Sequence, residues 1–481
     1  MNASPTPREH SARELTDRIA ALPMSRWHYN MIALTGAILI FDTADQGLAS
    51  ASQVDIARDF GVQQTELGLL ISAAFFGATI SAALIGFLAD RFGRKRMIAW
   101  SIVIFSLATA GASLSQDFSH LIVLRVIAGI GYGGLLPLAW AFGSEFSPVA
   151  SRGRTLSWLN AFYGAGSALA YLIGLAVIAP FGWRWGFAIF LIPTLLAVLV
   201  LRHMPEGAPY LIRKGRYDEA REQVERIEAK VLGNSPRPEA ISSVGDEFDT
   251  GADISMVRAA KLLFGRRHLL STTSTILAWP LPAMFVAGLL SFYPLIFVND
   301  LGLSLSQVLA FLTFSSFMTI VGRFLSGLFL DPIRRLSPSG MKTYLGVGVA
   351  FFGIMPFAIL ATEWSAAVLL VLLCAQYLLQ GLWAGAAMTY VPTVLPLALR
   401  NSGLGLFSAL TNLASIVGPI LMGALLEFGG LHLASWVVLT ASLLCAIFVI
   451  AFGHREPPII LPATPAGTIP AEVISNTAGE Q

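Results

Sequence analysis

The stretch Gly86-Phe87-Leu88-Ala89-Asp90-Arg91-Phe92-Gly93-Arg94-Lys95-Arg96 occurs a second time in this chain, in a diverged form. The second copy reads Gly327-Leu328-Phe329-Leu330-Asp331-Pro332-Ile333-Arg334-Arg335. Three residues keep their spacing and recur 241 residues later: Gly86, Asp90 and Arg94. One short basic loop would carry little information, but two copies after two long apolar segments indicate an internal repeat, and therefore a chain built from two related halves.

A second motif repeats in the same way. Glu145-Phe146-Ser147-Pro148, followed by Arg152 and Arg154, has a counterpart 248 residues later in Thr393-Val394-Leu395-Pro396, followed by Arg400. Acids and guanidinium groups at equivalent helix ends can form ion pairs, and glycines such as Gly86 permit close helix approach. We therefore expect a latch at these helix ends, with Asp90 paired to a basic residue and Arg152 and Arg154 near Glu145.

Composition excludes a water-soluble domain. Of 481 residues, 55% are hydrophobic and only 12% are charged, so the bilayer must be the solvent. The formal net charge of +2 is too near neutral to indicate nucleic-acid binding. Cys374 and Cys445 lie in apolar runs, which disfavours a disulfide framework or a cysteine metal site, and no cofactor is expected.

The apolar segments predict an all-α membrane protein with twelve transmembrane helices in two pseudo-symmetric six-helix halves. A membrane span needs about 20 apolar residues. Segments of this kind occur at 29–51, 66–89, 97–115, 121–143, 155–179, 185–203, 270–297, 304–330, 343–361, 365–391, 402–426 and 431–453.

The positions of lysine and arginine orient these spans. With both termini cytoplasmic, only Arg58 and Arg184 fall in external loops, while Arg125 and Arg323 lie within helices. The other 27 of the 31 basic residues occupy the tails, the cytoplasmic loops and their helix ends. Positive residues are retained on the cytoplasmic side, so this bias supports twelve spans in a plasma membrane, which we expect to be a bacterial inner membrane.

The same reading divides the chain into five parts. A cytoplasmic N-terminal segment (1–26) precedes the first half (27–203), and no cleavable signal is visible. A cytoplasmic linker (204–269) includes a segment, 217–226, whose Glu-to-Arg spacing is typical of a solvated helix, and it leads to the second half (270–453). Residues 454–481 have the composition of a disordered tail.

Ionisable residues inside spans are the sharpest functional signal, because each costs about 2.5–3.5 kcal/mol at the bilayer centre. Asp42 and Asp45, three residues apart, project to one face of the first span. Arg125 lies in the fourth span, and a buried guanidinium is tolerable only when it faces a carboxylate.

The loop from Gly86 to Arg96 resembles the signature loop of the major facilitator superfamily, over roughly residues 25–455. The run from Arg125 to Arg154 and the loop 204–216 are similar to those of aromatic-acid:proton symporters and, more distantly, proton-coupled sugar porters. Asp42-Thr43-Ala44-Asp45 matches the Asp-x-x-Asp pattern of the acid symporters, although Thr43-Ala44 replaces their usual Gly-aromatic pair. In the sugar porters the residue that matches Asp42 faces the one that matches Arg125.

This resemblance suggests a charge switch. Protonation of Asp42 or Asp45 would release Arg125 to hold a substrate carboxylate, and loss of the proton would restore the internal pair. Two acids could carry two protons, or one could take a proton while the other makes a structural or substrate contact. The alternative is that Asp42 and Arg125 form a buried pair that serves folding alone.

Other candidates rest on position. Polar or aromatic side chains in helices that commonly line the cavity of this fold, each of which could equally serve packing, are Asn160, Tyr163, Tyr293, Gln376, Gln380 and Asn412. Residues expected to gate or latch are Gly86, Asp90, Arg91, Gly93, Arg94, Glu145, Arg152, Arg154, Arg323, Asp331, Arg335 and Arg400. Arg323 is grouped with the latch because it precedes Gly327 by one turn.

The leading hypothesis is proton-coupled import of a small organic anion, an aromatic or aliphatic carboxylate, by a monomer with protons and lipid as its other partners. A sugar or polyol importer is the alternative, although the seventh span lacks the paired glutamines of sugar porters. A drug exporter is disfavoured because 160–179 has no Gly-Pro pair, and a non-transporting sensor because the linker contains no recognisable domain. The histidines are scattered and no Walker loop exists, which argues against an enzyme or an ATP-driven pump.

Overall fold

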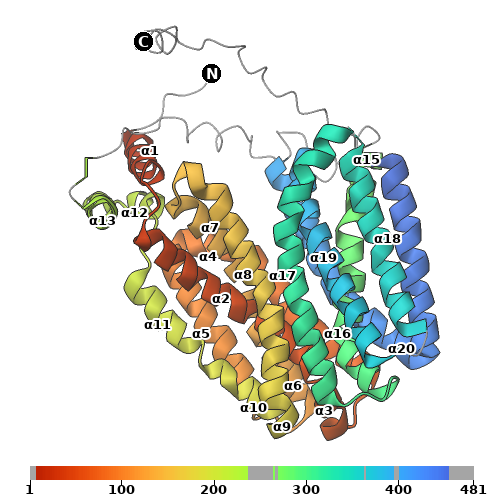
Figure 1. Cartoon of the computed structure of the whole chain (residues 1–481). Helices are drawn as coiled ribbons and strands as arrows, with labels where there is room; N and C mark the ends of the chain where they lie inside the picture. The colour runs from red at the N-terminus through yellow and green to blue at the C-terminus, as the bar shows by residue number, and fades with distance from the viewer. Residues whose placement is uncertain are drawn as a thin grey trace, which may run out of the picture.

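The computed structural model describes residues 7–233, 235–236, 264–265, 269–337, 339–361, 364–394 and 400–453, and within these ranges all regular structure is helical. Two helical bundles stand side by side, the N-terminal one red to yellow and the C-terminal one green to blue in Figure 1. The α-helices are α1 (Pro7–Ala20), α2 (Arg26–Ala51), α3 (Gln53–Phe60), α4 (Gln64–Phe92), α5 (Arg94–Ala112), α6 (Phe118–Tyr132), α7 (Leu135–Phe146), α8 (Arg152–Ile173), α9 (Ala179–Phe181), α10 (Trp183–Ala188), α11 (Thr194–His203), α12 (Ala208–Arg213), α13 (Tyr217–Leu232), α15 (Leu269–Ala278), α16 (Pro280–Asn299), α17 (Leu305–Leu336), α18 (Gly340–Ala361), α19 (Ala366–Val394) and α20 (Arg400–Phe452).

Within the described residues, ten helical segments are long and apolar enough to cross a membrane. Several are composite, since α6 with α7 and α15 with α16 each form one continuous segment. The last, Leu406–Phe452, has 47 residues and is interrupted at Gly430, whose φ of 62° is a conformation that favours glycine. The 19-residue α5 is not among the ten, although it packs between α6 and α11.

The two bundles meet along α4 with α20, α8 with α17, and α16 with α2. Glycines allow the backbones to touch at the first of these crossings. A Cβ on Gly68 would lie 2.3 Å from the carbonyl oxygen of Pro419, and one on Gly423 would lie 2.3 Å from that of Gln64. These contacts involve the start of α4, at the end of the molecule opposite α1, α12 and α13 (Figure 1). We call this the far end, and the end that carries α1, α12 and α13 the terminal end.

Helices α1, α12 and α13 pack together at the terminal end (Figure 1). Arg18 of α1 forms a bidentate ion pair with Glu228 of α13, at 2.8 Å from Nε and 2.7 Å from Nη2, and these hydrogen bonds raise the pKa of Arg18. The linker segment predicted as a solvated helix is α13, with the i,i+4 pairs Arg221–Glu225 and Arg226–Glu222 on its exposed face.

The opposite face of α13 is buried, so the sequence interpretation was incomplete. Ala220, Val224 and Ile227 join the main hydrophobic core together with Leu15 and Ile19 of α1. Alternate exposed ion pairs and buried aliphatic residues are the pattern of an amphipathic helix. Several parts named from the sequence lie outside the described residues: 1–6, most of 234–268 and the tail 454–481.

Candidate functional site

A charge pair is sealed inside the N-terminal bundle. Arg125 Nη1 of α6 lies 3.1 and 3.0 Å from the two carboxylate oxygens of Asp45 in α2, and Nη2 donates to the backbone carbonyl of Asp45 at 3.3 Å. Thr109 of α5 donates to the same carboxylate at 2.5 Å. The side chains of Arg125 and Asp45 are 1% and 0% exposed, so neither charge has access to bulk water.

Small residues fix α6 in the position that this pair requires. A Cβ on Gly129 would lie 2.0 Å from the carbonyl oxygen of Ala74 in α4, and one on Gly131 would lie 2.4 Å from the backbone nitrogen of Phe105 in α5. At the start of α6, the Asp117 side chain accepts from the His120 amide at 2.8 Å and caps the helix. Because α6 is held between α4 and α5, the guanidinium of Arg125 projects toward α2.

The second acid of the first span, Asp42, has a different partner. Its Oδ1 accepts a hydrogen bond from Gln46 Nε2, one turn along α2, at 3.0 Å, and the residue is 2% exposed. The resemblance to sugar porters suggested that Asp42 would face Arg125, but the residue that pairs with Arg125 is Asp45. Residues three apart on a helix point about 60° from each other, so the rotation of α2 decides which acid meets the arginine.

Beyond Asp42, α8 brings three further candidates together. A Cβ on Gly166 would lie 2.3 Å from the carbonyl oxygen of Ile40, so α8 lies directly against α2. The hydroxyl of Tyr163 lies near the Gln46 side chain and within electrostatic range of Asp42 and Arg323. Arg323 Nη1, from α17 of the other bundle, donates to the backbone carbonyl of Asn160 at 3.0 Å and to its side-chain oxygen at 3.3 Å.

Toward the far end, aromatic residues and an amide join α16 to α19. The Tyr293 hydroxyl donates to Gln376 at 2.8 Å, and the Tyr293 ring stacks on Phe297 at a centroid distance of 4.9 Å. Tyr293 is 0% exposed and Gln376 is 5% exposed. The structure therefore has these two predicted cavity residues in contact with each other, within the C-terminal bundle.

Two other predicted cavity residues take no part in the two hydrogen-bonded pairs described above. Gln380 of α19 and Asn412 of α20 are half-buried. Among the described residues, neither forms a hydrogen bond with the Asp45–Arg125 pair or with the Tyr293–Gln376 pair. Their assignment to the cavity remains a prediction.

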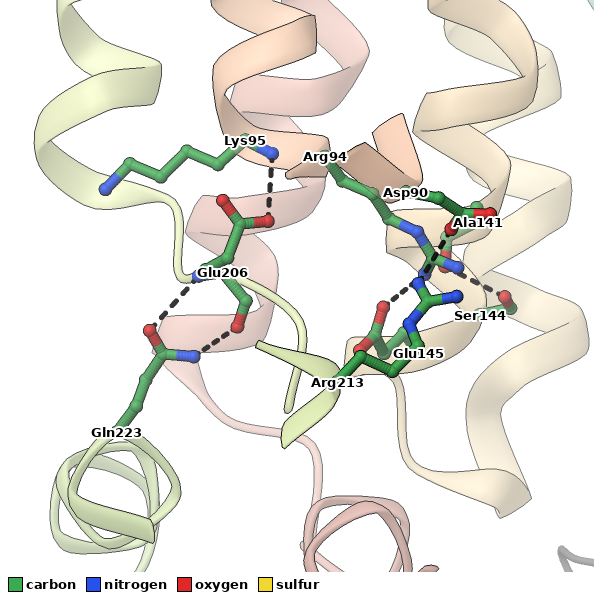
Figure 2. Close-up of polar contacts among 9 residues, drawn as sticks. All are labelled: Asp90, Arg94, Lys95, Ala141, Ser144, Glu145, Glu206, Arg213 and Gln223. Carbon is green, nitrogen blue, oxygen red and sulfur yellow. Dashed lines mark hydrogen bonds and ion pairs between the residues drawn. The ribbon is translucent and has the colours of Figure 1, made fainter. Parts of the chain in front are cut away.

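The first copy of each repeated motif forms ion pairs at the terminal end, as Figure 2 shows. Arg94, at the start of α5, forms an ion pair with Glu145 near the end of α7, where the Glu145 side chain is 8% exposed. Gly207 leaves room for this carboxylate, since a Cβ there would lie 2.6 Å from Glu145 Oε1. The sequence interpretation set Arg152 and Arg154 beside Glu145, whereas the ion-pair partner in the structure is Arg94.

The loop after α11 completes this site with residues that the motif alone did not predict (Figure 2). Asp90 accepts from Arg213 Nη2 at 2.7 Å, and both side chains are more than half exposed. Glu206 accepts from the Lys95 amide at 3.2 Å, while its own amide donates to Gln223 at 3.1 Å. Burial raises the pKa of Glu206, and the backbone hydrogen bond from Lys95 opposes that effect.

Gly93 explains why Glu206 can approach so closely. Its φ is 94°, a region open mainly to glycine, and a Cβ there would lie 2.5 Å from Glu206 Oε2. Gly86 behaves differently, because a Cβ there would meet no atom within 4 Å. Among the residues that the structure describes, none makes the close helix contact predicted for Gly86.

The remaining latch candidates have other surroundings. Arg91 lies over the ring of Phe92 at 5.5 Å, and Arg154 over the ring of Trp158 at 5.3 Å. The Nε of Arg152 is buried and, among the described residues, has no hydrogen-bond partner. The side chains of Asp331, Arg335 and Arg400 lie outside the part of the chain that the structure describes. In the same part, no group of three or more His, Cys, Asp or Glu residues could hold a metal ion.

Comparison with known proteins agrees with this architecture. The family model described as Major Facilitator Superfamily matches residues 34–376 and 339–478. The niacin transporter NiaP of Acinetobacter baylyi is 28% identical over 444 residues, which cover 92% of this chain and 97% of that protein. The benzoate transport protein of the same organism is 24% identical and covers 90% of each chain.

A solved structure shares the fold at lower sequence identity. The inward open conformation of the xylose transporter XylE from Escherichia coli has a TM-score of 0.69 and 18% identity, and it covers 89% of this chain and 97% of that one. Since the family model matches far more than half of the residues, this chain belongs to the major facilitator superfamily, and it is related to transporters of aromatic and other organic acids.

Proposed function

We propose that this protein is a proton-coupled transporter that imports a small organic anion, with Asp42 and Asp45 as the carboxylates that take the proton. The observation that carries the proposal is the buried arrangement of two carboxylates and one guanidinium in α2 and α6. If both acids were ionised, one negative charge would stay uncompensated in an apolar interior, which is costly. The pair of acids is therefore expected to hold one proton and to release it when water gains access.

Several groups face these two acids and define the proton site. Asp45 is held by Arg125 and Thr109, and Asp42 by Gln46. Tyr132 of α6 and Tyr163 of α8 lie within electrostatic range of Asp42, and Tyr132 also of Asp45. Because the two acids lie one turn apart on α2, we assign the proton to the pair.

Alternating access accounts for the contacts between the bundles. At the far end, Ser50 of α2 donates to the Ser291 carbonyl at 2.6 Å, and Ser72 of α4 donates to the Ile416 carbonyl at 2.6 Å. The open space at Gly86, at the other end of α4, supports a terminal end that is less tightly closed. We interpret the conformation as inward-facing, with the far end external and the terminal end cytoplasmic.

This interpretation fits twelve spans in a bacterial inner membrane, with both termini cytoplasmic and the monomer as the transporting unit. Counting α20 as two spans divided at Gly430, and α5 as one, brings the ten segments to twelve. The Arg94–Glu145 and Asp90–Arg213 pairs, which are formed here within the N-terminal bundle and its linker, would then break or exchange partners when the cytoplasmic end closes.

The relatives support a carboxylate as the substrate. They include a benzoate transport protein, a cis,cis-muconate transport protein and a 4-hydroxybenzoate transporter, each of which aligns with at least 86% of this chain. A sugar is the second candidate because an arabinose-proton symporter of Bacillus subtilis is 32% identical, although only over 206 residues.

Uptake into proteoliposomes separates these candidates. With the external medium more acidic than the lumen, we expect labelled nicotinate or benzoate to accumulate above the level in protein-free vesicles, which must be subtracted because the neutral acids cross bilayers unaided. Labelled arabinose and xylose are expected to stay at the background level. Accumulation of the sugars but not of the acids, or acid uptake unaffected by collapse of the pH gradient, would contradict the proposal.

A further inference from the structure

Arg323 lies at the boundary between the bundles and, among the described residues, has no acidic partner. Its Nη1 donates only to oxygens of Asn160, at 3.0 and 3.3 Å, and its Nε is buried without a hydrogen-bond partner among the described residues. No carboxylate of the described residues lies within ion-pair distance of it. A half-buried positive charge with neutral partners alone is unfavourable, which makes this group a candidate for binding an anion.

Arg125 and Arg323 differ in whether the guanidinium is free to bind a substrate carboxylate. Arg125 already holds both oxygens of Asp45 and is 1% exposed, so a substrate carboxylate would have to displace an internal one in a sealed interior. Arg323 is only half-buried and has no internal anion to displace. Of the two intramembrane arginines, Arg323 is thus the one with both spare donors and access.

The surroundings of Arg323 are shaped for a small ligand. Gly164 presents no side chain to the guanidinium, and a Cβ there would lie 3.0 Å from Nη1. The half-buried Asn160 and Tyr163 supply an amide and a hydroxyl from α8. Arg323 itself comes from α17, so an anion bound here would contact both bundles, and binding would be sensitive to their relative movement.

We infer that Arg323, with Asn160 and Tyr163, forms the site for the substrate carboxylate, while Asp45–Arg125 stays an internal pair. The inference rests on the proposed function and assigns its anion site. It also revises the roles expected from the sequence, where Arg125 was the carboxylate ligand and Arg323 a latch residue. A planar guanidinium can bind a carboxylate through two hydrogen bonds, which gives both affinity and orientation.

Tyr163 lies within electrostatic range of both Asp42 and Arg323, which gives this site a link to the proton. Gln46 lies near the Tyr163 hydroxyl, and its side-chain amide donates a hydrogen bond to Asp42 at 3.0 Å. An ionised Asp42 would repel an anion bound beside Tyr163, and protonation would remove that competing charge. Proton binding at the acids thus favours anion binding at Arg323, as symport requires.

Equilibrium binding to the purified full-length protein tests the inference, with benzoate and nicotinate as probes and benzamide and nicotinamide as uncharged isosteres. For Arg323→Gln we expect a loss of affinity for both acids on the order of 10- to 100-fold, the effect of losing a charge-assisted contact, and little change for the amides. Arg323→Lys should lose less. Arg58→Gln, an exposed arginine of α3, is the matched control and should bind like the wild type.

A second variant covers the case in which Arg323→Gln does not fold. Asn160→Asp keeps Arg323 but supplies the missing internal carboxylate next to Nη1, so it should weaken binding of the acids by a similar factor in a protein of normal thermal stability. Wild-type affinity for the acids in a folded Arg323→Gln protein would overturn the inference and leave the proposed function intact. Failure of the wild type to bind or transport any carboxylate would overturn both.

Discussion

Replacing Arg125 with leucine is expected to lower the stability of the protein by about 3–5 kcal/mol, because the buried Asp45 carboxylate would be left without its partner. The loss should exceed that of any single change at the exposed ion pairs of the terminal end, such as Asp90–Arg213, where solvent screens the charges. Thermal unfolding in detergent, followed by loss of the monodisperse chromatographic peak, measures the effect.

A double variant distinguishes charge imbalance from lost packing. Asp45→Asn combined with Arg125→Gln removes both charges and keeps side chains of similar shape, so it should recover much of the stability that Arg125→Leu loses. It should not recover proton-driven uptake, because only Asp42 remains of the two acids that share the proton. If Arg125→Leu were as stable as the wild type, the pair would not be sealed as the structure has it.

Replacing Gly129 with valine is expected to destabilise the N-terminal bundle by about 3 kcal/mol or more, since overpacking of a tight contact forces backbones apart. A Cβ at this position would lie 2.0 Å from the Ala74 carbonyl oxygen, so α6 would have to move away from α4. That movement would also shift Arg125, which is one turn earlier on α6, away from Asp45.

Gly86→Ala is the control. It also replaces a glycine of the N-terminal bundle, in α4, but at a position where an added Cβ would meet no atom within 4 Å. We expect it to be as stable as the wild type or up to about 1 kcal/mol more stable, because alanine is the better helix former and its Cβ meets no atom here. Its transport rate is a separate matter, since Gly86 is expected to approach another helix in the outward-facing state. Equal destabilisation by Gly129→Val and Gly86→Ala would contradict the helix packing described here.

The family and the general architecture could be predicted from the sequence because they depend on periodic and repeated features. Apolar segment lengths indicate membrane helices whatever their packing, and the spacing of Gly86, Asp90 and Arg94 reveals the repeat without knowledge of contacts. The comparison with family models confirms the assignment to the major facilitator superfamily. The intrahelical ion pairs of α13 were also predictable, since they depend only on spacing.

The pairing of individual charges could not be predicted in the same way. The side chains of Asp42 and Asp45 point in directions only about 60° apart around α2. Which of them meets Arg125 is determined by how α2 packs against its neighbours, and the sequence does not give that packing. Arg323 looked like a latch residue by its distance along the chain from Asp331, but its contacts lie across the boundary, on Asn160. Glu206 joined the terminal-end site through a loop that lies 111 residues from Lys95 in the sequence.

The most direct test of the central claim, that Asp42 and Asp45 couple protons to anion transport, is simultaneous measurement of proton and nicotinate fluxes in weakly buffered proteoliposomes, corrected for protein-free vesicles. For the wild type we expect the medium to become more alkaline in step with nicotinate uptake. For Asp45→Asn and for Asp42→Asn we expect this alkalinisation to be lost or strongly reduced relative to any nicotinate that still moves. An unchanged ratio of protons to nicotinate in both variants would contradict the account.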